Sequence, residues 1–185
     1  MAKKGIVETY GKKPAAKRVD FIINNFTIIE DLIKGEEECL YVQIRRDQEE
    51  RLSEQRADLG VKIQTFHKSD ITGDTATANA DTQAGIENGD WRLATRGIKD
   101  FTKYRKAIET LQLMRDDYTI VRGKLKGIKD VDHVFMDYLT KEKTYDEMAD
   151  DLQLSHEAVR SRVFRTKAIL KENALESMEA EKKCA

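Results

Sequence analysis

Three kinds of residue are scarce in this chain of 185 residues: it has one proline, two cysteines and 7% aromatic residues. Proline breaks the interior of a helix, so its scarcity leaves long stretches free to be helical. The two cysteines, Cys39 and Cys184, are far apart in sequence and do not suggest a disulfide framework. Charged residues make up 36% of the chain and hydrophobic residues 39%. This composition predicts an elongated all-α protein.

The sequence also lacks apolar runs long enough to span a membrane, and it lacks a signal peptide. We therefore expect a protein of a reducing cytoplasm with no membrane partner. The net charge of −1 gives no support for nucleic-acid binding, so evidence for such binding must come from a local basic patch.

Motifs of catalysis and metal binding are missing as well. The stretch Gly123-x-x-x-Gly127 lacks the Lys-Ser/Thr of a phosphate-binding loop, and no G-x-S-x-G motif is present. The three histidines, His67, His133 and His156, are too scattered to suggest a metal site. We expect neither an enzyme nor a bound cofactor or metal. Paired carboxylates such as Asp116-Asp117 and Asp150-Asp151 are expected on solvated faces.

In the first part of the chain, residues 1–64, a basic stretch precedes two apolar stripes. Met1 to Lys13 predicts a loose arm, and Pro14 suits the first turn of a helix. The stripes that follow step by three or four residues, which predicts either a helical hairpin or one long helix. Packing inside the molecule is the favoured interpretation of the first stripe, and a seam between two copies is the alternative. The stripe residues are Val19, Ile22, Phe26, Ile29 and Ile33, then Leu40, Ile44, Leu52 and Leu59.

The middle of the chain changes character twice. Residues 65–90 are rich in Gly, Asn, Asp and Thr and predict a flexible connector, with one weak helix from Thr75 to Ala84 as the alternative. Residues 91–122 carry apolar side chains at helical spacing and predict an amphipathic helix that connects to the C-terminal domain. Those side chains are Ile98, Phe101, Tyr104, Ile108, Leu111, Met114 and Tyr118.

Residues 123–185 predict a helix-turn-helix domain. Gly123 and Gly127 are expected to loosen the chain before a supporting helix, whose apolar residues are Val131, Val134, Phe135, Tyr138 and Leu139. In the stretch from Thr144 to Lys171, Met148, Ala149 and Leu152 predict the packed face of a first helix, with Leu154 continuing that contact through the turn. Ser155 is well placed to cap a second helix that starts near His156.

The second helix has a narrow apolar stripe and a basic exposed surface. At about 100° per residue, the predicted buried residues are Val159, Val163, Thr166 and Leu170. The first helix instead carries four carboxylates, so only the second can approach a polyanion at low electrostatic cost. We expect the DNA-binding residues to be Ser155, His156, Glu157, Arg160, Ser161, Arg162, Phe164, Arg165 and Lys167.

The string T-x-x-E-M-A-x-x-L-x-L-S-x-E-x-V-x-S-R-V-x-R-x-x-x-x-L resembles region 4 of bacterial sigma factors, which recognises the −35 promoter element. The match runs from about Ile128 to Leu170. The resemblance implies base-reading roles at four positions, although the family often has Arg where this chain has His156. These positions are His156, Glu157, Arg160 and Ser161. It implies supporting backbone contacts at three more, Arg162, Arg165 and Lys167.

A region 4-like segment without the rest of a sigma factor is similar to phage-encoded late-gene regulators of the ArpU and RinA type. That resemblance implies a sequence-specific transcription regulator, an activator at promoters with host RNA polymerase, in the cytoplasm of a bacterial host cell. Its partners would be double-stranded DNA, RNA polymerase and a second copy joined through the N-terminal helices. The alternative is a small-terminase-like protein of phage DNA packaging, which also combines a helix-turn-helix with a helical oligomerisation segment.

Overall fold

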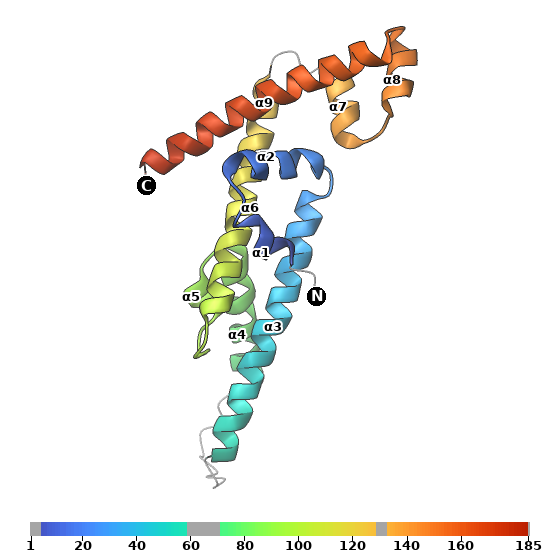
Figure 1. The fold of residues 1–185 in the computed structure, drawn as a ribbon. Coiled ribbons are helices and arrows are strands. Elements are labelled where there is room, and N and C mark those ends of the chain that lie inside the picture. Colours follow the sequence, from blue (N-terminus) through green and yellow to red (C-terminus); the bar gives the residue numbers. More distant parts are fainter. Residues whose placement is uncertain (1–4, 59–70, 129–132, 185) are drawn as a thin grey trace. The chain divides into compact units, whose positions relative to one another are not determined.

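The computed structural model describes residues 5–58, 71–128 and 133–184, and every regular element in these ranges is a helix (Figure 1). The expected all-α class is thus confirmed for the described residues. None of their helices is long and apolar enough to cross a membrane. The helices are α1 (Ile6–Tyr10), α2 (Ala15–Asn24), α3 (Ile29–Asp58), α4 (Ile71–Glu87), α5 (Trp91–Ala94), α6 (Thr102–Gly127), α7 (His133–Thr140), α8 (Tyr145–Leu152) and α9 (His156–Cys184).

The chain forms two compact units. The first combines Met1–Glu8 with Ile33–Leu113, and the second combines Thr9–Leu32 with Met114–Ala185. Each unit joins segments that lie far apart in the sequence, so the units cut across the four sequence ranges predicted for the chain.

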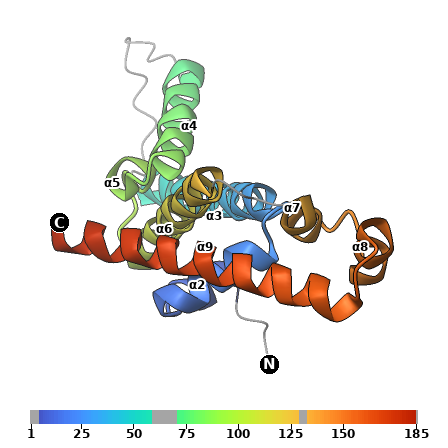
Figure 2. The same cartoon turned by 90° about the horizontal axis from the view of Figure 1, so that it is seen from above.

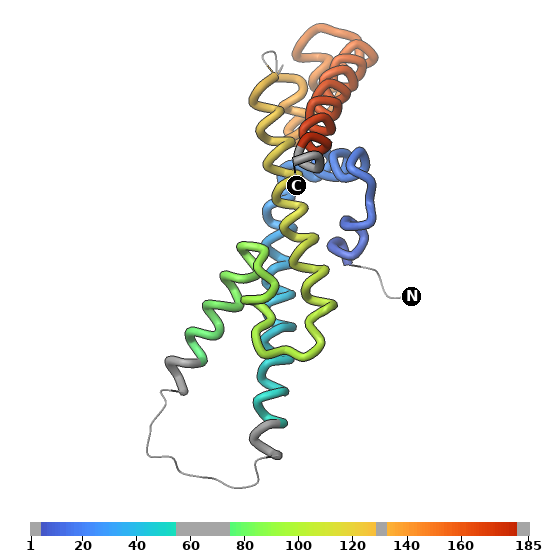
Figure 3. Tube along the Cα trace, turned by 90° about the vertical axis from the view of Figure 1, so that its left-hand side faces the viewer, coloured from blue at the N-terminus to red at the C-terminus, as the bar shows by residue number. Residues whose placement is uncertain are grey.

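Helix α4 of the first unit lies where the sequence predicts a flexible connector. The flexible connector is wrong for Ile71–Glu87, which is helical and packs against α5 (Figure 3). The alternative, a helix from Thr75 to Ala84, is confirmed with wider bounds. Residues 65–70 lie outside the described residues. The small residues that suggested a loop serve a different purpose: a Cβ on Gly85 would lie 2.5 Å from the backbone nitrogen of Ala94. Glycine here permits close contact between helices.

Helix α4 is also joined to α3 by a polar contact. Thr82 is buried, its hydroxyl donates to the carbonyl oxygen of Ala78 at 2.8 Å, and Gln48 Nε2 donates to that hydroxyl at 3.3 Å. Ile86 is buried in the same helix. The contacts of α4 thus involve the Thr82 hydroxyl, Gly85 and the buried Ile86 side chain.

The segment predicted as a single amphipathic helix over 91–122 is two helices. Helix α5 has four residues, and α6 begins only at Thr102, because Gly97 between them has a φ of 88° that ends regular helix. Within α6, the predicted core residues are largely confirmed. The buried ones are Tyr104, Ile108, Leu111 and Met114, whereas Tyr118 is half-buried and Phe101 is exposed. Gly123 lies inside α6 and Gly127 ends it, so neither interrupts the helix where the sequence predicted loosening.

The loose arm predicted from Met1 to Lys13 is instead anchored in its described part, and residues 1–4 lie outside the described residues. Residues 6–10 form α1, and the Tyr10 side chain is fully buried. Its hydroxyl donates to Asp117 Oδ2 at 2.8 Å, and Arg18 Nε donates to the same oxygen at 2.6 Å. Burial, with the Asp117 carboxylate second, raises the pKa of Tyr10 well above its usual value.

Asp117 overturns the expectation of a solvated carboxylate pair. It is buried at 2% exposure, while Asp116 beside it is exposed. The carboxylate is stable there because it accepts three hydrogen bonds, two of them from the Arg18 guanidinium. This cluster of Tyr10, Arg18 and Asp117, all in the second unit, fixes Tyr10 and α2 against α6.

The first apolar stripe is divided between two helices. Helix α2 ends at Asn24 and α3 begins at Ile29, so the single long helix is excluded. Val19, Ile22 and Ile29 are fully buried within one chain. The favoured interpretation of this stripe, packing inside the molecule, is therefore confirmed at these three residues, and the alternative of a seam between copies fails there because solvent cannot reach their side chains. Of the later stripe residues, Leu52 is exposed, and Leu59 lies outside the described residues.

Candidate nucleic-acid interface

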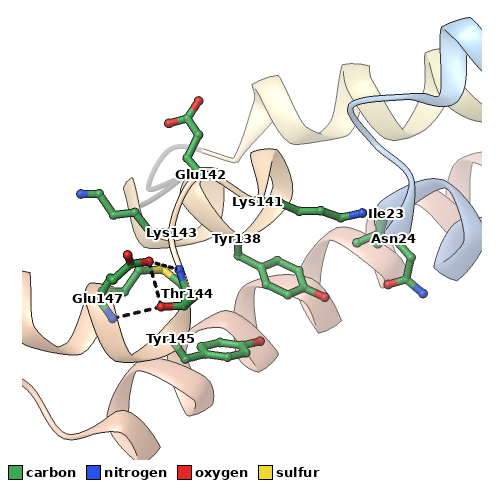
Figure 4. A pocket seen from close by; sticks show the side chains of 10 residues that line it. Ile23, Asn24, Tyr138, Lys141, Glu142, Lys143, Thr144, Tyr145 and Glu147 are labelled. Atoms are coloured by element: carbon green, nitrogen blue, oxygen red, sulfur yellow. Dashed lines mark hydrogen bonds between the residues drawn. The ribbon is translucent and has the colours of Figure 1, made fainter.

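The segment predicted as a helix-turn-helix begins with α8, whose N-terminus is capped by a capping box. The hydroxyl of Thr144 accepts from the backbone nitrogen of Glu147 at 3.4 Å, and the Glu147 carboxylate accepts from the backbone nitrogen of Thr144 at 2.7 Å (Figure 4). The Thr144 hydroxyl also donates to Glu147 Oε2 at 2.8 Å. The two hydrogen bonds that the Glu147 carboxylate accepts from Thr144 lower the pKa of Glu147, the backbone donor contributing most. This capping box was not among the features predicted from the sequence, although T-x-x-E before an apolar residue is its signature.

A short turn then leads into α9. Gln153 ends α8 in the left-handed conformation, with a φ of 53° and a ψ of 38°. Ser155 Oγ accepts from the backbone nitrogen of Ala158 at 3.2 Å, and α9 begins at His156. The predicted cap and the predicted start of the second helix are both confirmed. Ser155 thus uses its hydroxyl to begin the helix.

The predicted buried stripe of α9 is confirmed in its apolar members. Val159, Val163 and Leu170 are buried, and Thr166 is half-buried. Helices α2, α7 and α8 all pack against α9, which runs across the view in Figure 2. Full burial of a Val or Leu side chain contributes about 1.5–3 kcal/mol. These contacts fix which side of α9 faces outward.

Helix α7 supports α9 as expected. Its buried residues are Val134, Phe135 and Leu139; Val131, also predicted for this helix, lies outside the described residues. Two other predicted contacts are wrong, because Leu152 is 40% exposed and Leu154 is 41% exposed. Helix α8 ends at Leu152 and its packed face consists of Met148 and Ala149, so the apolar contact does not continue through the turn.

The outward surface of α9 carries most of the predicted DNA-binding residues. The exposed ones are His156, Glu157, Arg160, Ser161, Arg162, Phe164 and Arg165. Arg165 Nε donates to the carbonyl oxygen of Ser161 at 3.4 Å, which holds this guanidinium beside the preceding turn. The small exposed Ala168 follows one turn after Phe164. We call this surface the outward face of α9.

Two predicted residues are engaged by neighbouring helices. Lys167 Nζ donates to Asn24 Oδ1 of α2 at 3.2 Å and lies 3.5 Å from the Tyr138 hydroxyl of α7. Its ammonium group therefore helps to join three helices and contributes less to the outward face. The His156 ring meets the Tyr145 ring edge to face at 5.6 Å, and its Nε2 lies 3.8 Å from Asp146 Oδ1.

A hollow lies beside this motif, and sequence reasoning did not identify it. It is lined by Ile23, Asn24, Tyr138, Lys141, Glu142, Lys143, Thr144, Tyr145, Glu147 and Met148 (Figure 4). The rings of Tyr138 and Tyr145 are 6.0 Å apart at 31°, and Phe135 stacks on Tyr138 at 5.9 Å. The hollow thus lies where α2, α7 and the start of α8 meet, and the stacked rings belong to the packing between α7 and α8.

Charge separates the two helices of the motif. The four acidic residues of α8 are all exposed: Asp146, Glu147, Asp150 and Asp151. One of them is partly neutralised, because Lys143 Nζ lies 2.6 Å from Asp151 Oδ2. The outward face of α9 instead presents Arg160, Arg162 and Arg165. A polyanion is therefore attracted to α9 and repelled by α8.

In the described part of the chain, no group of three or more His, Cys, Asp or Glu residues is placed to hold a metal ion. Comparison with known protein families, with curated proteins and with solved structures yields no match to this chain.

Proposed function

We propose that this protein binds double-stranded DNA in a sequence-specific manner through α9 and regulates transcription. The observation that carries the proposal is the pairing of an acidic α8 with an α9 whose outward face bears three exposed arginines. Arg160, Arg162 and Arg165 lie on a helix whose opposite side is fixed by Val159 and Val163. A rigid helix with basic and hydrogen-bonding side chains on its outer surface matches the width and charge of the major groove.

The proposal extends to promoters. The residues from Thr144 to Lys171 resemble sigma factor region 4, and a late-gene activator of phage type that acts with host RNA polymerase follows from that resemblance. The acidic surface of α8 would remain clear of DNA in such a complex, which leaves it available to a protein.

The proposal is tested by measuring binding to DNA selected from a random duplex pool. The double variant Arg160→Ala with Arg165→Ala removes two exposed cations from the outward face. If each contacts a base or phosphate, binding weakens by about 1–3 kcal/mol per contact. The plot of log affinity against log salt concentration becomes shallower by about 0.9 for each phosphate that the variant no longer neutralises.

A matched control separates this effect from a general loss of charge. Arg46→Ala with Arg96→Ala removes two exposed cations from the first unit and leaves the outward face intact. We expect this control to bind DNA as the wild type does. Equal binding by both double variants would show that α9 is not the DNA-reading helix. Helical circular dichroism checks that each variant is folded.

A further inference from the structure

The most exposed large apolar side chain among the described residues lies in the middle of the outward face. Phe164 is 72% exposed, more than any other such side chain in the described ranges. Exposing an aromatic ring of this size is unfavourable in water, and buried aromatic rings contribute much of the energy at interfaces. A basic surface with an apolar group at its centre is complementary to a partner that is anionic and also presents an apolar group.

The surroundings of Phe164 follow from the geometry of α9. Residues three and four positions apart are neighbours on a helix, so Arg160 and Ser161 lie in the turn before Phe164 and Ala168 in the turn after. All of these are exposed. The ring thus has cationic and hydrogen-bonding neighbours on one side and a small methyl group on the other, which leaves room for a partner to approach.

We propose that Phe164 contacts the 5-methyl group of a thymine in the major groove and so determines part of the sequence preference. Thymine is the only base that presents a methyl group there, and apolar side chains, Phe included, are its natural contacts. Phe164 lies eight residues after His156, which is about 12 Å along the helix axis. The major groove is also about 12 Å wide. A helix segment of this length therefore fits within the groove, with the ring and the first residues of α9 both near base edges.

Self-association through this face is disfavoured by its charge. Two copies that met through Phe164 would bring the three arginines of one face, Arg160, Arg162 and Arg165, against those of the other, with only Glu157 of each face to offset them. Like charges at an interface oppose association. Phosphates flanking the groove pair instead with these arginines, so the charges favour DNA as the occupant of the face.

This inference rests on the proposed DNA-binding function, and the experiment separates the two. A site is first selected with the wild-type protein from random duplex DNA. Each thymine of that site is then replaced singly by deoxyuridine, which removes only the methyl group. For one thymine we expect wild-type affinity to fall about fourfold, the factor that corresponds to about 0.8 kcal/mol for one buried methyl-sized group.

The variant Phe164→Ala supplies the second arm. It should bind the thymine duplex more weakly than the wild type and should not distinguish thymine from deoxyuridine at that position. The control Leu152→Ala, which truncates an exposed apolar side chain of α8, should keep the fourfold discrimination. Both side chains are exposed, so both variants should fold as the wild type does.

Four results would overturn the inference. The first is wild-type binding that no thymine replacement weakens, which leaves the DNA-binding function standing. The second is a discrimination that survives in Phe164→Ala. The third is failure to select any DNA, which removes the proposed function as well. A change in sedimentation of Phe164→Ala relative to the wild type would also count against it, because the ring would then belong to a protein interface.

Discussion

Helix α9 packs in its unit through large apolar side chains, whereas α4 packs against α5 through a glycine. Helix α9 buries large apolar residues, such as Val159 and Leu170, against three other helices. Helix α4 meets α5 through Gly85 and buries the hydroxyl of Thr82. The first contact gains stability from apolar area removed from water, and the second from the close approach that a missing side chain allows. The two units should therefore respond differently to added and to removed atoms.

The largest effect is expected from removing a partner in the buried cluster of the second unit. Asp117→Ala leaves the Arg18 guanidinium and the Tyr10 hydroxyl buried without their acceptor. Breaking a buried ion pair on one side costs about 3–5 kcal/mol of folding stability. Urea unfolding followed by circular dichroism measures the loss. Asp116→Ala makes the same chemical change at the exposed neighbour and should cost far less; equal losses would refute the role of the cluster.

The next effect concerns added atoms in the first unit. Gly85→Ala places a methyl group 2.5 Å from the Ala94 nitrogen and 2.8 Å from its Cα, so α4 and α5 must separate. Such overpacking costs about 1–3 kcal/mol. Thermal unfolding of the full chain measures the change.

A matched substitution within a helix has the opposite sign. A Cβ on Gly35 in α3 meets nothing within 4 Å, so Gly35→Ala should stabilise the protein by up to about 1 kcal/mol through reduced backbone entropy of the unfolded chain. Stabilisation by Gly85→Ala would show that α4 does not depend on close contact with α5.

A smaller effect is expected at the start of α8. Thr144→Ala removes the hydroxyl that accepts from the Glu147 backbone nitrogen, and loss of a helix cap costs about 1 kcal/mol. Amide hydrogen exchange should report faster opening in the first turn of α8. Thr110→Ala, the same substitution inside α6, is the control, because the Thr110 hydroxyl donates to the Lys106 carbonyl oxygen and caps no helix N-terminus. Equal protection of α8 in both variants would contradict the cap.

The smallest effect depends on pH. The Thr144 backbone and side-chain donors lower the pKa of Glu147 below its ordinary value of 4.5. A carboxylate whose pKa is lowered in the folded state stabilises it above pH 4.5, and this contribution is lost as the pH falls through the lower folded-state value. The stability difference between wild type and Glu147→Gln should therefore shrink on acidification. Stability curves measured between pH 3 and pH 7, roughly the range in which a carboxylate titrates, test this; a constant difference would contradict it.

The parts of the fold that the sequence predicted share one feature, which is regular spacing of large apolar side chains. That spacing predicted the buried side of α9 and the core positions Tyr104, Ile108 and Leu111 of α6, since large side chains gain most from burial. Ser155 was predictable as a cap because its neighbours already defined the start of a helix. The full length of α4 was not predictable in this way, because Gly and Thr have low helix propensity and the contacts with α5 and with Gln48 of α3 compensate.

Local sequence determined the all-helical class of the described residues, the start of α9 at His156 and the outward face of α9, because each depends on residues within a few turns of one another. The tertiary structure alone decided three other features. Asp117 is buried because Arg18 and Tyr10, about 100 residues away, neutralise and hydrogen-bond it. The first apolar stripe was open between core and a seam between copies, with core favoured, and the burial of Val19, Ile22 and Ile29 decided for core. The Lys167 ammonium group hydrogen-bonds to Asn24 and Tyr138 and so contributes less to the outward face of α9. Each outcome depends on contacts with residues that are distant in the sequence, and a local sequence pattern does not predict such contacts.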